Sequence, residues 1–445
     1  MIEDYNEIID GQAETKKLRW KFDNFHPPDW NKSQSNTFTL SSDPSYLSTE
    51  RFFKVLSSGQ KCFKGGTDSS KTPNSADKCV CTPNYHGQDC GVPDAVWFGS
   101  MSSATRKNLR VRTRMRRLIH ALPVNHEYDF FETRVRSLEE VVDVFIIQES
   151  NYTTFGTPKD LLFLDKLQKG WLSDVQDKIL WVLLPYFADR GKDNGWYADS
   201  FIRMYLSKMG LKLVHNQDDE DIYLLLDADE LPLPEVLLFL KLYDGYTQPI
   251  RFGFRWTVFG FFWLKAEDPG VMENIPLIGK LIKAKPKERL LQLWVACTLG
   301  MLRDVYSNNA MLLRRNVWEN ELLADKLKNF TSKIIQNSGG TPVRQWDVGK
   351  LGHYAGYHCS WCYSPEGIRT KLLSAQKHDK PRWGDYPEKT NLTYIAELIK
   401  TGGWFDNTRP FIQEKWDVSN KFYAPQYILK HKDRFQYLLK LPEEL

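Results

Sequence analysis

Short apolar runs, each followed by polar or acidic residues, are the clearest pattern along the chain. Residues 141–147, 179–184 and 221–226 have the length and apolar continuity of buried strands. Between and after them, residues 196–209 and 235–242 carry apolar side chains at helical spacing. Because the connecting segments are long enough to cross back over a sheet, the pattern predicts an α/β fold with parallel strands and helices on both faces.

A later apolar stretch, residues 251–263, alternates in part and predicts further strand. Together these elements are typical of a doubly wound, Rossmann-type sheet. No G-x-G-x-x-G follows the first strand, so nothing supports nicotinamide binding through that fingerprint. A nucleotide site at the first strand end and an acidic site at a later one would suit a nucleotide-sugar transferase.

Composition divides the chain into four expected parts. Residues 1–60 are polar and without periodicity, which is typical of a poorly ordered stem. Residues 61–92 are a small cysteine-rich module, and residues 93–120 are expected to be a linker. Residues 121–445 contain the apolar runs and are expected to form the main domain.

The charge balance narrows the range of partners. The chain has 60 basic and 56 acidic side chains and a net charge of +4, so we expect no nucleic-acid partner. We interpret the basic cluster at residues 106–117 as a solvated linker. No apolar run is long enough to span a membrane, and the acidic, polar N-terminal segment does not have the pattern of a signal peptide.

The cysteine spacing indicates disulfides and an oxidising compartment. From Cys79 to Cys90 the chain reads C-x-C-x5-G-x2-C, which resembles the C-terminal half of an EGF-like module. Close cysteines in a segment with little core favour disulfide bonds. The alternative is a zinc site that adds Cys62 and His86, although its spacing fits common zinc motifs poorly.

A second cysteine pair, Cys359 and Cys362, forms a C-x-x-C without a thioredoxin-like context. A short disulfide or two buried thiols is favoured there over redox chemistry. Four N-x-S/T sequons are weak further evidence for the secretory pathway, since they arise by chance at about this frequency. They begin at Asn31, Asn151, Asn329 and Asn391.

Two carboxylates, Asp227 and Asp229, stand two residues apart just past the third predicted strand. In an α/β sheet, this edge is where ligands bind. Carboxylate oxygens suit Mn²⁺ or Mg²⁺, and such an ion can in turn hold a diphosphate. The D-x-D spacing alone is weak evidence, because an acidic strand end is often only a turn and a helix cap.

A family resemblance rests on a series of short motifs. They are VNHEYD (124–129), ESNYTTFG (149–156), NGWYAD (194–199), DADELP (227–232), FLKLYDG (239–245), GFFW (260–263), GYHCSWC (356–362), SAQ (374–376), PRWGD (381–385) and TGGWFD (401–406). Over about residues 62–440, their order resembles that of the bisecting N-acetylglucosaminyltransferases, glycosyltransferase family 17.

The resemblance implies a GT-A fold that transfers N-acetylglucosamine from UDP-N-acetylglucosamine (UDP-GlcNAc). The implied acceptor is the core β-mannose of an N-glycan on a glycoprotein, and the implied product is a β1,4 linkage. A transferase of the same fold with a different glycan acceptor is the alternative. The family is Golgi-resident and of type II membrane topology. This sequence contains no such anchor, so we expect membrane attachment only through an N-terminal anchor absent from it.

Sugar transfer from UDP requires that the leaving diphosphate be neutralised, and Mn²⁺ or Mg²⁺ meets that need. We expect Asp229 to bind the ion directly and Asp227 to contact the ribose or a metal-bound water. The resemblance implies that both are essential. His358 is a candidate third metal or phosphate ligand, with a satisfied core histidine as an equal alternative.

Three further residues are candidates for donor binding. Glu149 and Ser150 end the first predicted strand, where the uridine usually sits in this fold, and a plain strand-end turn is the alternative. Arg203, on the helix of residues 196–209, would contact phosphate. An ion pair with Asp199, four residues earlier, is slightly favoured over that contact.

Inversion by a single displacement needs a carboxylate near the acceptor hydroxyl as general base. Glu366 and Asp385 are the two candidates and rank equally. Glu366 follows Ser364 and a proline, a helix N-cap and N1 pattern, so its alternative role is to stabilise the helix dipole. Asp385 lies in a polar loop, where an ion pair with Arg382 is the alternative.

Two other classes of function are alternatives to the transferase. A metal-dependent phosphatase with a D-x-D-x-[T/V] nucleophile would need Thr or Val where Leu231 stands. A lectin-like or catalytically silent protein would not require the intact pair of Asp227 and Asp229. Both classes are therefore less favoured.

Overall fold

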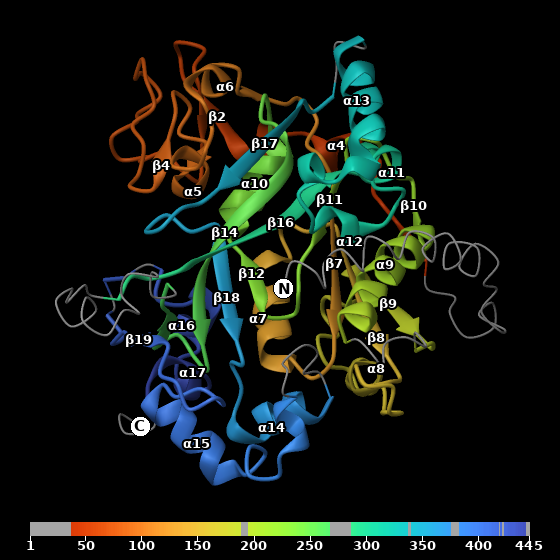
Figure 1. Ribbon diagram of the computed structural model, residues 1–445. Helices are drawn as coiled ribbons and strands as arrows, with labels where there is room; N and C mark the ends of the chain where they lie inside the picture. Colours follow the sequence, from red (N-terminus) through yellow and green to blue (C-terminus); the bar gives the residue numbers. More distant parts are fainter. Residues whose placement is uncertain are drawn as a thin grey trace, which may run out of the picture.

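A mixed sheet forms the centre of the protein in the computed structural model, which describes residues 37–187, 195–267, 286–336, 340–374, 382–417, 419–420 and 422–441 (Figure 1). Its main strands follow the order β12-β18-β14-β16-β11-β7-β8-β9, and the predicted α/β fold is confirmed. The strands are β7 (Leu118–Val124), β8 (Val144–Ser150), β9 (Ile179–Leu184), β11 (Ile222–Leu225), β12 (Glu230–Pro232), β14 (Gln248–Val258), β15 (Trp263–Lys265), β16 (Leu290–Thr298), β17 (Val343–Val348), β18 (Gly356–Ser360) and β19 (Phe411–Gln413).

Most of the expected stem, residues 1–36 with the sequon at Asn31, lies outside the described residues, as do motif residues 194, 375–376 and 381. No helix in the described ranges is long and apolar enough to cross a membrane.

One half of the sheet is parallel, as the sequence pattern predicts. β11, β7, β8 and β9 pair side by side in the same direction. Three of them match predicted strands, but β7 starts at Leu118, inside the segment expected to be a linker. His120 and Pro123 interrupt its apolar run, which explains why the pattern alone did not predict this central strand.

The other half of the sheet is mixed. β16 pairs antiparallel with both β11 and β14, and β14 pairs in parallel with β18. Antiparallel pairing of β12 with β18 then brings the chain just after β11 against a strand more than a hundred residues later. This pairing of β12 with β18 assembles the candidate site.

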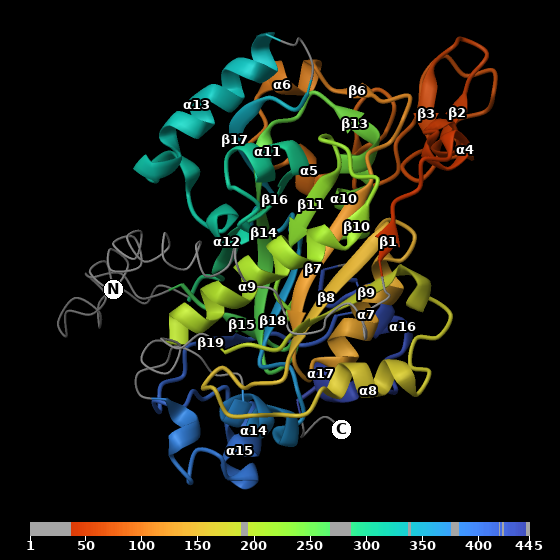
Figure 2. The same cartoon turned by 90° about the vertical axis from the view of Figure 1, so that its right-hand side faces the viewer.

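Side chains along the parallel strands alternate between two hydrophobic layers. On β7, Leu118 and Leu122 belong to one core cluster, and Ile119 and Ala121 belong to the other. Figure 2 shows α9 lying across these strands. Because both faces are covered, the strands read as continuous apolar runs rather than as alternating ones.

The helices of the two layers come from crossovers and from the later chain. α7, α8, α10, α16 and α17 pack in one layer, and α9, α11, α12 and α13 pack in the other. Their bounds are α7 (Tyr128–Leu138), α8 (Leu162–Gln168), α9 (Gly195–Lys212), α10 (Pro234–Leu242), α11 (Leu299–Asp304), α12 (Ala310–Leu313), α13 (Glu321–Gln336), α16 (Gln426–Lys430) and α17 (Gln436–Leu439).

The cysteine-rich segment is held by two disulfides, Cys62–Cys79 and Cys81–Cys90. All four thiols are therefore used, which removes the alternative zinc site, and His86 pairs with Asp94 instead. The short elements before the sheet and two outlying strands are β1 (Phe38–Thr39), α4 (Pro44–Leu47), β2 (Phe53–Val55), β3 (Lys61–Phe63), β4 (Tyr85–His86), β5 (Val92–Pro93), α5 (Asp94–Trp97), α6 (Ser103–Lys107), β6 (Arg110–Val111), β10 (Val214–His215) and β13 (Tyr243–Asp244).

A third cluster lies beyond the end of β18, where α14 (Pro365–Ser374) and α15 (Leu392–Thr401) pack together at the lower end of Figure 1. Trp361 is buried there and contacts Trp404 edge to face. Cys359 and Cys362 form a short disulfide, one of the two arrangements expected for this pair, and it ties the end of β18 to the start of this lobe.

Candidate functional site

The acidic loop after β11, residues 227–230, is fixed through its backbone by a buried arginine. Arg134 on α7 is fully buried, and its Nη2 donates to the carbonyl oxygens of Asp227 at 2.7 Å, Ala228 at 2.9 Å and Glu230 at 2.6 Å. Burial lowers the pKa of Arg134 to about 10, so the guanidinium stays charged at neutral pH. The loop conformation therefore depends on one side chain of α7, a helix about ninety residues earlier in the chain.

Asp227 is oriented by Arg203 on α9. The guanidinium donates from Nη2 to Oδ2 of Asp227 at 2.6 Å and from Nε to Oδ1 at 3.1 Å. It also pairs with Asp199, the ion pair that the sequence slightly favours. Burial opposes the charge of Arg203, but the two aspartates outweigh it and raise its pKa. A phosphate contact by Arg203 stays a prediction.

Asp229 points to the opposite side of the loop, toward β18 and α14. The backbone N–H of Cys359 donates to the Asp229 carbonyl at 2.9 Å, which places His358 beside the carboxylate. Nδ1 of His358 lies 3.8 Å from Oδ1 of Asp229, and Nζ of Lys371 lies 3.3 Å from Oδ2. Burial alone would raise the pKa of Asp229, but Lys371 and His358 outweigh it and lower the pKa below its ordinary value.

Glu230 is the buried acid of the loop. Its carboxylate accepts from the backbone N–H of Asp227 at 2.9 Å and from Nη2 of Arg314 at 2.7 Å. Burial, which outweighs the attraction of Arg314, raises the pKa of Glu230. Glu230 thus closes the turn and takes part in the ligand group described next.

The site fits a divalent ion. Within the described residues, Asp229, Glu230 and His358 each offer a ligand atom within 4.8 Å of the others. Nδ1 of His358 is buried and has no hydrogen-bond partner in the described part of the chain, whereas its Nε2 lies 2.6 Å from Oγ of Ser360. An orphaned imidazole nitrogen facing carboxylate oxygens suits Mn²⁺. Asp227 lies outside this group, and its role at the ion stays a prediction.

The end of β8 carries the two residues predicted to bind the donor. Both carboxylate oxygens of Glu149 accept N–H groups, from Phe163 at 2.8 Å, Leu164 at 3.0 Å and the Trp181 indole at 3.1 Å. The buried carboxylate therefore caps α8, and a donor contact by Glu149 stays a prediction. Ser150 lines a small pocket between the ends of β8 and β9 and α9.

The two base candidates both lie in the lobe around α14. Glu366 is exposed in its first turn, where the residue's own backbone N–H and Ser364 lower its pKa. Asp385 ends a short 3-10 helix and accepts from Nε of Arg382 at 2.7 Å. Each thus makes the interaction given above as its alternative, and neither role as base is tested by the geometry.

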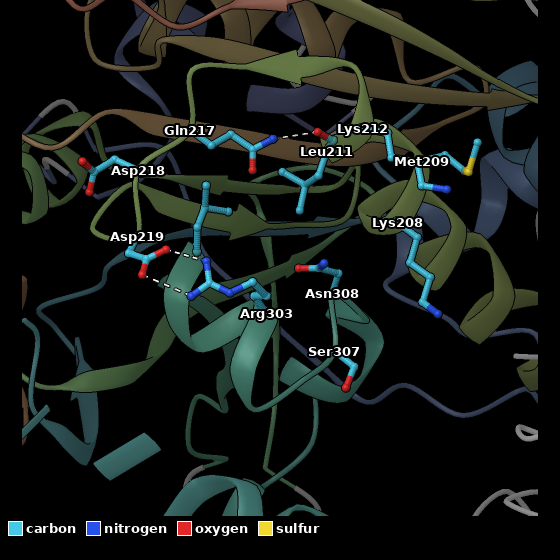
Figure 3. Close-up of a pocket in the computed structure, with 11 residues that line it drawn as sticks. Lys208, Met209, Leu211, Lys212, Gln217, Asp218, Asp219, Arg303, Ser307 and Asn308 are labelled. Carbon is cyan, nitrogen blue, oxygen red and sulfur yellow. Dashed lines mark hydrogen bonds and ion pairs between the residues drawn. The ribbon is translucent and has the colours of Figure 1, made fainter. Parts of the chain in front are cut away.

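A cavity beside the C-terminal end of α9 is shown in Figure 3, and it lies away from the acidic loop. Its volume is about 390 Å³, and an ion pair between Arg303 and Asp219 lines it, with Lys208 and Lys212 nearby. Asp219 precedes β11, whereas Asp227 follows it, so cavity and acidic loop lie at opposite ends of that strand. Ligand binding in α/β sheets favours the end where Asp227 lies.

Comparison with known proteins agrees with the geometry. Residues 100–269, which include the acidic loop, match glycosyltransferase family 17. The chain belongs to glycosyltransferase family 17. Over 365 residues it is 40% identical to rat and human proteins named β-1,4-mannosyl-glycoprotein 4-β-N-acetylglucosaminyltransferase, and over 388 residues it is 38% identical to the mouse protein of that name.

These family 17 relatives are longer than the chain. The rat and human alignments cover 82% of this chain but 62% of each relative, and the mouse alignment covers 87% and 65%. The chain therefore spans about three fifths of the length of the rat and human proteins.

Sequence reasoning missed four charged residues at this family 17 site. Arg134, Arg314, Lys371 and Glu230 all contact the acidic loop or belong to it. Glu230 belongs to the DADELP motif and directly follows Asp229, so its position next to the predicted metal ligands could have identified it. The three cations come from distant segments, and nothing in their local sequence distinguishes them from solvated surface charges.

Proposed function

We propose that the protein transfers N-acetylglucosamine from UDP-GlcNAc to the core β-mannose of N-glycans in β1,4 linkage, with inversion and with Mn²⁺ or Mg²⁺. The observation that carries the proposal is the acidic loop. Its carboxylates belong to the segment that matches family 17, and they lie beside the orphaned imidazole nitrogen of His358, which comes from later in the chain. The names of the relatives support the choice of donor sugar and acceptor.

Each group at the loop has a task in this proposal. When bound, the divalent ion neutralises charge on the departing diphosphate. Asp229 and His358 hold the ion, and Asp227 contacts the ribose, kept in place by Arg203. The uracil lies near Ser150, at the carboxyl ends of the parallel strands. Glu149 anchors α8 beside the same strand end.

For the general base, Asp385 is the better of the two candidates. Its 3-10 turn packs against α14, where a Cβ on Gly384 would meet the carbonyl of Leu372. Leu372 follows Lys371, the residue that reaches Asp229. Glu366 lies five residues before Lys371, which rotates its side chain by about 140° around the helix. An exposed ion pair such as Arg382–Asp385 is weak enough to release the carboxylate.

The finer features of the fold and setting belong to the same proposal. Residues 118–445, from the start of β7, form a GT-A transferase domain, after a stem, an EGF-like module at residues 61–92 and a linker at residues 93–117. Three disulfides support a lumenal, oxidising compartment, and we assign the Golgi. Glycoproteins that carry N-glycans are the partners.

The test is a transfer assay. The protein is incubated with UDP-GlcNAc, Mn²⁺ and a biantennary N-glycan, and the product is examined by mass for one added N-acetylhexosamine and by NMR for its linkage. We expect one addition by the wild type and none by Asp229→Ala. Hydrolysis of UDP-GlcNAc without glycan product would show that the acceptor is a different one. Absence of both reactions would reject the transferase assignment.

A further inference from the structure

The cations around the acidic loop are not held equally. In the part of the chain that the structure describes, three arginines make several contacts or are deeply buried, and one lysine is attached by a single hydrogen bond. Arg134 bonds three loop carbonyls, and Arg203 bonds two carboxylates. Lys371 bonds only Oδ2 of Asp229, at 3.3 Å, among those residues.

The setting of Lys371 allows its ammonium to move. Its side chain is 16% exposed and lies over the rings of Trp361 and Tyr363, at 5.1 Å and 5.6 Å from their centroids. Aromatic faces hold a cation without fixing its direction. A lysine head group sits on a flexible four-carbon stem, unlike the rigid fork of an arginine. Lys371 can therefore exchange partners without a change in the backbone.

Charge balance gives the reason for an exchange. Among the described residues, four cations face four carboxyl groups at the loop, and the buried carboxyl of Glu127 attracts Lys371 as well. The four cations are Arg134, Arg203, Arg314 and Lys371, and the four carboxyl groups are those of Asp199, Asp227, Asp229 and Glu230. A divalent ion held by Asp229 and His358 would add positive charge beside the ammonium, and like charges at that separation repel. A donor diphosphate would supply a new negatively charged partner for the ammonium, in place of Asp229.

We infer that Lys371 neutralises Asp229 while ion and donor are absent, and that its ammonium passes to the donor diphosphate when both bind. This inference rests on the proposed function and adds a donor-binding residue to it. Lys371 opposes binding of the ion by itself and favours binding of the nucleotide to the ion-loaded protein. The two bindings are thereby coupled, and the disulfide Cys359–Cys362 ties the strand of His358 to the turn just before the helix of Lys371.

The test measures binding rather than turnover. Titration calorimetry gives the affinity for Mn²⁺ alone, and then for UDP with Mn²⁺ saturating, in the wild type and in Lys371→Met. The matched control is Arg369→Met, an exposed cation two residues earlier on the same helix. Thermal unfolding checks that each variant is folded.

We expect Lys371→Met to bind Mn²⁺ alone about fivefold or more tightly than the wild type, and to bind UDP in the presence of Mn²⁺ about fivefold or more weakly. Arg369→Met should match the wild type in both titrations. Weaker or unchanged Mn²⁺ binding by a folded Lys371→Met protein would overturn the inference, as would unchanged UDP binding. If the wild type binds neither Mn²⁺ nor UDP, the proposed function itself fails.

Discussion

Arg134→Met should remove the hydrogen bonds that hold the acidic loop on α7 and so lower the stability of the fold. Methionine has about the length of the arginine stem but no donor, so three carbonyl oxygens, one buried and two half-buried, lose the Nη2 that they share. Nε2 of His120 loses its partner at 3.1 Å as well. Leaving a buried polar group unsatisfied costs about 1–3 kcal/mol.

The expected total is therefore about 3–6 kcal/mol, because water reaches part of the loop and some carbonyls find new partners. That is a large share of the roughly 5–15 kcal/mol that stabilises an ordinary domain. Urea unfolding followed by tryptophan fluorescence measures the change in the free energy of unfolding. Because the same carbonyls shape the turn between Asp227 and Glu230, affinity for Mn²⁺ should fall as well.

Arg136→Met is the matched control, since Arg136 lies two residues later on the same helix and pairs with Asp174 at 2.6 Å near the surface. An exposed ion pair contributes up to about 1 kcal/mol, so this variant should stay close to the wild type. Arg134→Lys should recover part of the stability, because the three N–H donors of a lysine ammonium can bond some of the same carbonyl oxygens. Equal, small losses for Arg134→Met and Arg136→Met would refute the role given to Arg134.

Three further outcomes follow from the site. His358→Ala should weaken Mn²⁺ binding at least about tenfold in calorimetry, and unchanged affinity would remove it from the ligand group. Glu149→Gln should cost about 1–3 kcal/mol in urea unfolding, since an amide group replaces an acceptor that faces N–H donors; if stability holds and UDP affinity falls tenfold instead, Glu149 binds the donor. Replacing Cys359 and Cys362 together by Ala should cost about 2 kcal/mol in the unfolded-chain entropy model, with a lower melting temperature as the readout; an unchanged melting temperature would contradict a structural role for this disulfide.

Local patterns predicted part of the fold, namely four strand segments and two helices. Continuous apolar runs predicted β8, β9 and β11, because a strand covered on both faces carries few polar residues to interrupt its apolar run. The same reasoning failed for β7, whose run contains a histidine that bonds Arg134 inside the core. A polar residue satisfied by a distant partner cannot be recognised from its neighbours in sequence.

The sequence by itself determined the α/β class, the family motifs and the position of Asp227 and Asp229 at a strand end, and it favoured disulfides in the cysteine-rich segment. These features depend on neighbouring residues or on fixed spacing. Only the tertiary structure decided which charges meet at the loop: Arg203 on Asp227, and His358 and Lys371 on Asp229. Such pairs join segments far apart in the chain, and their geometry follows from strand order and helix packing, which no local pattern encodes.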